Sequence, residues 1–76
     1  ILITGAGGAA AISVWKSLSQ DHHIFMADID PCAAGLYLVP PERRCIIPSG
    51  HSSEFIPHLI NICKKNAIKL IIPTVD

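Results

Sequence analysis

The chain has 76 residues, of which half are apolar and only 16% are charged, and its formal net charge is zero. A balanced charge leaves no electrostatic footprint for nucleic acid or for an anionic membrane, so neither is expected as a partner. No apolar run approaches the roughly 20 residues that a membrane-spanning helix needs.

The first part of the chain predicts two buried strands around a helix. Residues 1–4 form a continuous apolar run that ends at glycines, which is typical of a strand buried on both faces of a parallel sheet. Apolar residues then recur at helical spacing from residue 9 to about residue 20. A second buried strand is predicted over residues 24–27, directly before Asp28 and Asp30.

The second part predicts a short helix, two strands and a longer helix. The short helix covers residues 32–38 and must stop at the proline pair 40–41, because proline lacks the N–H donor. Brief strands are predicted over residues 45–47 and 70–72. We expect the second of these to be a central strand, buried on both faces.

The longer helix lies between those two strands. Ser52 or Ser53 can cap its beginning, and Asn66 is placed to end it as a left-handed cap. Its apolar stripe is Phe55, Leu59, Ile62 and Cys63. The complete order is β-α-β-(short α)-β-α-β, which predicts an α/β, Rossmann-like three-layer sandwich with a four-stranded parallel sheet.

A glycine turn separates the first strand from the first helix. The pattern is G-x-G-x-x-A, with Gly5 permitting the tight turn, Gly7 allowing close approach of a ligand, and Ala10 allowing helix and strand to pack closely. N–H groups at a helix start also favour an anion. The turn is therefore either purely structural or the binding site of a dinucleotide, another anion or a carboxylate-bearing substrate.

Acidic residues follow two of the predicted strands. Asp28 and Asp30 come after the second strand, where dinucleotide-binding folds place a ribose-binding acid. They bind ribose hydroxyls, bind a substrate amine, or only shape the turn before Cys32; the pattern favours Asp30 over Asp28 as a binding residue. Asp76 follows the fourth strand, where α/β folds collect ligands, and is a candidate substrate contact.

The remaining polar residues suggest no catalytic or metal site. The four histidines and three cysteines have no metal-ligand spacing, and no Ser-His-Asp or Cys-His arrangement is recognisable. Three cysteines without a CxxC pair fit buried thiols in a reducing compartment, so the cytoplasm is expected. Arg43 and Arg44 either bind phosphate from a neighbouring domain or mark an exposed strand entrance.

Residues 1–8 resemble the opening of extended short-chain dehydrogenases and nucleotide-sugar epimerases. Their pattern is T-G-x-x-G-x-x-G, and Ala11 stands here at the last glycine. This resemblance implies an NAD(P)-binding domain. Those enzymes would be expected to end the fourth strand in a His-Ala-Ala-like turn, whereas this chain continues as Pro-Thr-Val-Asp.

A second resemblance covers essentially the whole chain. Residues 27–31 followed by 34–38 resemble the second βα unit of the N-terminal domain of ATP-grasp enzymes, especially proteins similar to the large subunit of carbamoyl-phosphate synthase. Residues 46–48 and 69–76 continue the likeness. We therefore expect residues 1–76 to be a single N-terminal pre-ATP-grasp domain, excerpted from a longer multidomain ligase and inactive alone.

The ATP-grasp resemblance also implies a reaction and partners. The parent enzyme would form a C–N bond through an acyl phosphate, with ATP and Mg²⁺ held by C-terminal ATP-grasp domains of the same polypeptide. This domain would bind a carboxylate or amine substrate and contribute no catalytic residue and no metal ligand. A homodimer is compatible with the family, and a non-catalytic regulatory module is a third reading. The implied substrate-binding residues are Gly5, Ala6, Gly7, Gly8, Asp30 and Asp76.

Overall fold

The computed structural model describes residues 1–74. Strands and helices alternate in the expected order, with two short 3-10 helices between the second and third strands. The bounds are β1 (Leu2–Thr4), α1 (Ala9–Leu18), β2 (Phe25–Asp28), η1 (Ala34–Leu38), η2 (Pro41–Arg43), β3 (Arg44–Ile46), α2 (Phe55–Lys65) and β4 (Ile71–Pro73). The helix predicted over residues 32–38 is therefore a 3-10 helix that begins two residues later.

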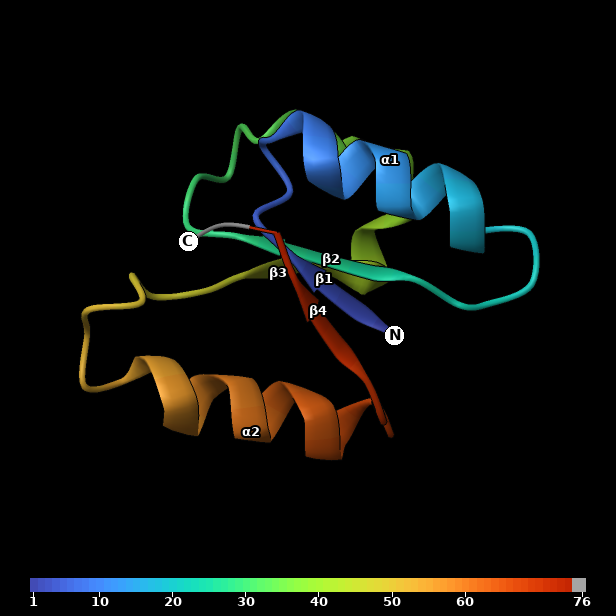
Figure 1. The fold of residues 1–76 in the computed structure, drawn as a ribbon. Coiled ribbons are helices and arrows are strands. Elements are labelled where there is room, and N and C mark those ends of the chain that lie inside the picture. Colours follow the sequence, from blue (N-terminus) through green and yellow to red (C-terminus); the bar gives the residue numbers. More distant parts are fainter. Residues whose placement is uncertain (75–76) are drawn as a thin grey trace.

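The four strands form one parallel sheet in the order β3-β2-β1-β4. Helix α1 covers one face and α2 the other, so the molecule has three layers (Figure 1). This arrangement confirms the predicted α/β fold. The expected central position of the fourth strand is wrong, because β4 lies at an edge of the sheet and the side chain of Ile71 is 37% exposed.

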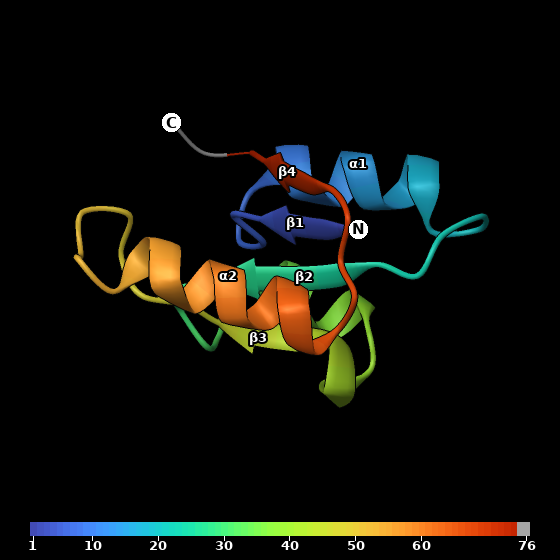
Figure 2. The same ribbon diagram turned by 90° about the horizontal axis from the view of Figure 1, so that it is seen from below.

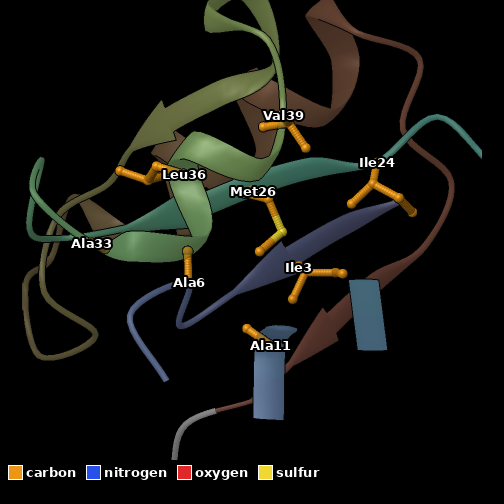
Figure 3. Packing of buried hydrophobic residues seen from close by; sticks show 8 residues of the cluster. All are labelled: Ile3, Ala6, Ala11, Ile24, Met26, Ala33, Leu36 and Val39. Atoms are coloured by element: carbon orange, nitrogen blue, oxygen red, sulfur yellow. The ribbon is translucent and has the colours of Figure 1, made fainter. Parts of the chain in front are cut away.

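Alternation along the central strands divides the core between the two faces. Ile3 and Met26 point to the α1 face, where they pack with η1 and α1, whereas Leu2 and Ala27 belong to the cluster on the α2 face. Figure 3 shows the side chains of the α1-face cluster gathered between the strands and η1, with Ala11 on the α1 side. Its eight buried residues are Ile3, Ala6, Ala11, Ile24, Met26, Ala33, Leu36 and Val39.

The two ends of α2 differ from the predicted caps. The helix begins at Phe55, and neither Ser52 nor Ser53 caps it. The Ser52 hydroxyl instead accepts a hydrogen bond from the N–H of Glu54, the residue directly before the helix. At the other end, Ala67 and not Asn66 adopts the left-handed conformation, with φ of 55°. The Ile68 N–H then donates to the Cys63 carbonyl at 2.9 Å, which completes a Schellman-type ending.

The parallel arrangement brings the carboxyl ends of all four strands to one edge of the sheet. The strand order and common direction are visible from below in Figure 2. The loops that follow β1 and β3 leave this carboxyl edge toward opposite faces, the first to α1 and the second to α2 (Figure 1). Ligands of open α/β sheets bind outside the carboxyl ends of the strands, at the point where the strand order reverses, which in this sheet lies between β1 and β4. Within residues 1–74 no helix has the length and hydropathy required to cross a bilayer.

Candidate functional site

The turn after β1 is a hydrogen-bonded loop of residues 5–8. Gly5 has a φ of 79°, in the left-handed region that residues with a Cβ rarely adopt. The Gly8 N–H donates to the Gly5 carbonyl at 3.0 Å, immediately before α1 begins. Ala6 is fully buried, whereas Gly7 and Gly8 are exposed. The conformation of this turn therefore requires glycine at position 5.

The carboxylate of Asp28 already contacts the glycine turn. Its Oδ2 accepts a hydrogen bond from the Gly7 N–H at 2.9 Å, and its Oδ1 accepts one from the Asp30 N–H at 2.9 Å. Asp28 thus ties the loop after β1 to the loop after β2. The sequence predicts that a ligand approaches the backbone at Gly7. In the structure the Gly7 N–H already has a partner within the chain, the carboxylate of Asp28.

Asp30, the aspartate that the sequence pattern favours, turns toward the following loop. It is exposed, and its Oδ1 accepts a hydrogen bond from the Cys32 N–H at 2.9 Å. This bond is the local turn interaction that aspartate commonly makes with an amide two residues on. Asp30 therefore shapes the loop after β2, and its role in substrate binding stays a prediction.

The small residue that lets α1 pack closely against the sheet is Ala11, and not Ala10 as the glycine-turn pattern predicts. Ala10 is exposed, whereas Ala11 has no exposed surface and lies between α1 and the sheet (Figure 3). A small residue at position 11 lets the helix approach β1 closely. Ala11 therefore has a sufficient structural reason to be small, and its place at the last glycine of the dehydrogenase pattern does not itself indicate a dinucleotide.

A cleft of about 670 Å³ opens at the carboxyl edge, on the side of α2. This volume lies within the range of small-molecule sites, about 300–1,000 Å³. All four strands contribute to it, either by their last residues or by the loops that follow them. Its lining consists of Thr4, Gly5, Asp28, Ile29, Ile47, Pro48, Ser49, Gly50, His51, Phe55 and Pro73.

Of the five predicted site residues that the structure describes, Gly5 alone lines this cleft. Ala6 is buried beneath the turn, and the exposed Gly7 and Gly8 lie outside the lining. Asp76 lies outside the described residues. The structure therefore does not gather the predicted set in one place, and the substrate contacts assigned to these residues remain predictions.

The cleft contains residues that the sequence reasoning passed over. The polar loop after β3 contributes Ser49, Gly50 and His51, and the first turn of α2 contributes Phe55. The signal for them was available, because the loop follows a parallel strand and so lies at the edge where α/β folds bind ligands.

A hydroxyl group holds the two strand ends beside the cleft together. Thr74 follows β4, and its Oγ1 donates to the Thr4 carbonyl at 2.6 Å, with the Gly5 carbonyl at 3.4 Å. Pro73 of β4 lies opposite Thr4 of β1 in the sheet. This contact fixes the floor of the cleft where β1 and β4 meet.

Arg44 has a structural role at the opposite edge of the sheet. Its Nε donates to the carbonyls of Leu36 and Val39, at 2.7 and 3.0 Å, and so caps the end of η1. The guanidinium also lies 4.6 Å from the centroid of the Tyr37 ring, within cation–π range. These contacts hold η1 against β3 and give Arg44 a structural role, and phosphate binding by Arg43 or Arg44 stays a prediction.

The three cysteines lie outside the cleft lining, whereas one histidine, His51, belongs to it. Burial raises the pKa of the Cys45 thiol above its ordinary value, and the neighbouring Cys63 raises it further. A raised pKa disfavours the nucleophilic thiolate. Among residues 1–74, no group of three or more His, Cys, Asp or Glu side chains is placed to hold a metal ion. The described part of the cleft therefore offers polar binding groups, among them Thr4, Ser49 and His51.

Comparison with known families identifies the chain at the family level. Its whole length, residues 1–76, matches the family described as PylC-like, N-terminal domain. No curated protein matches the chain. The chain therefore belongs to the PylC-like N-terminal domain family, a pre-ATP-grasp domain of ATP-grasp enzymes. This finding confirms the resemblance to ATP-grasp enzymes, whereas a specific likeness to carbamoyl-phosphate synthase stays a prediction.

Proposed function

From this family membership we propose that the domain forms one wall of the acceptor-substrate site in an ATP-grasp ligase. The parent enzyme would join a carboxylate to an amine through an acyl phosphate. The match of all 76 residues to a family of N-terminal domains carries the proposal. A ligase parent follows from the family, and the substrate-binding role is our inference from the position of the cleft.

The cleft supports that role because its walls suit an organic ligand. Ile47, Phe55 and Pro73 provide apolar surface, while Thr4 and Ser49 add polar groups near the strand ends. A concave apolar site with a few polar groups is the usual form of a small-molecule site. In the proposed enzyme these residues hold and orient the acceptor and exclude water from the face that the ATP-grasp domains complete.

The described residues do not fit Mg-ATP itself. The cleft lining contains no Lys or Arg to bind a triphosphate, and Asp28 is its one described carboxylate. We therefore derive no step through ATP within this domain. The nucleotide and Mg²⁺ would be held by C-terminal ATP-grasp domains of the same polypeptide, and this chain would supply no catalytic residue. Cytoplasmic location and a homodimer remain expectations of the same proposal.

A thermal-shift measurement on the complete gene product tests the proposal. A ligand that binds only the folded state adds about 2.7 kcal/mol at 100 times its Kd, and so raises the Tm. We expect Mg-ATP to raise the Tm, and NAD(P) with or without Mg²⁺ to leave it unchanged. Stabilisation by NAD(P) and not by Mg-ATP would replace the ligase with the dehydrogenase alternative.

A further inference from the structure

We draw no further inference here: the strongest candidate, the apolar groove that Ile56, Ile60 and Ile71 line between α2 and β4, carries no proposal because nothing in the structure of residues 1–74 shows what covers it.

Discussion

The two faces of the sheet differ in how completely other elements cover them. The α1 face buries eight residues under α1 and η1, and Gly35 of η1 lies directly against the glycine turn. On the α2 face the buried residues within residues 1–74 are Leu2, Ala27, Ile47 and Leu59. Beside them Ile56 and Ile60 of α2 stay exposed, at 59% and 47%. One helix and one 3-10 segment thus close the first face, and one helix half-covers the second.

The two faces of the sheet therefore have different roles: the α1 face supports the strand ends, and the α2 face carries the candidate binding site. The closed face fixes the glycine turn and the ends of β1 and β2, since well-packed interiors deform little. The open face carries the cleft and, between α2 and β4, a smaller apolar groove of about 260 Å³. We therefore assign rigidity to the α1 face and binding to the α2 face. Substitutions on the two faces should differ accordingly.

The largest effect is expected for Gly35→Ala on the closed face. A Cβ at this position would lie 2.3 Å from the backbone oxygen of Ala6 and 2.8 Å from the Met26 methyl carbon. Overpacking, together with loss of the Gly35–Ala6 hydrogen bond, is expected to lower the free energy of unfolding by about 4 kcal/mol. Urea denaturation measures it. The matched control is Gly50→Ala, whose Cβ meets nothing within 4 Å and should leave stability unchanged.

A pair of leucine truncations compares the two faces directly. Leu36 on the closed face is 1% exposed and Leu59 on the α2 face is 8% exposed. We expect Leu36→Ala to cost about 3 kcal/mol and Leu59→Ala about 2 kcal/mol, because the open face can relax around the lost side chain. Urea denaturation of both variants gives the difference. A larger loss for Leu59→Ala would reverse the assignment of rigidity.

A stabilising change is expected at the end of α2. Ala67 has a φ of 55°, which glycine adopts without the steric cost of a Cβ. Ala67→Gly should therefore raise the free energy of unfolding by about 1 kcal/mol. Asn66→Gly is the matched control, because Asn66 has a φ of −109° and its side-chain amide donates to the Ile62 carbonyl. The control should destabilise the chain.

The smallest effect concerns the Cys45 thiol beneath α2. Burial raises its pKa above the ordinary 9.0, so the folded state favours the neutral thiol. Its contribution to stability is complete below pH 9.0 and is lost as the pH rises through the higher folded pKa. Iodoacetamide at pH 8 should therefore modify the exposed Cys32 well before Cys45, as peptide mass spectrometry would reveal. Equal rates would mean that the α2 face opens readily.

The sequence was sufficient for the fold class because periodicity and turn residues are local signals. The buried strands around Ile3 and Met26, the glycine turn and both long helices were predicted within a few residues. The position of β4 was not, since an apolar run such as residues 70–72 looks alike at the centre and the edge of a sheet. Strand order depends on which segments pair, and that information is not local.

The site was harder to predict than the fold. Asp28 and Asp30 are the same residue type two positions apart, so the sequence does not distinguish them. Only the folded turn shows that Asp28 accepts the hydrogen bond from the Gly7 N–H. His51 and Phe55 reach the cleft through a loop whose path the sequence does not specify.

Amide hydrogen exchange on the 76-residue chain tests the central claim, that the α1 face is the rigid scaffold and the α2 face the adaptable one. The account predicts that amides of α1 and β2 exchange only through global unfolding, whereas those around Leu59 in α2 exchange through a smaller opening. The opening free energy in α2 should be lower by about 1 to 2 kcal/mol. Equal or greater protection of α2 would contradict the account.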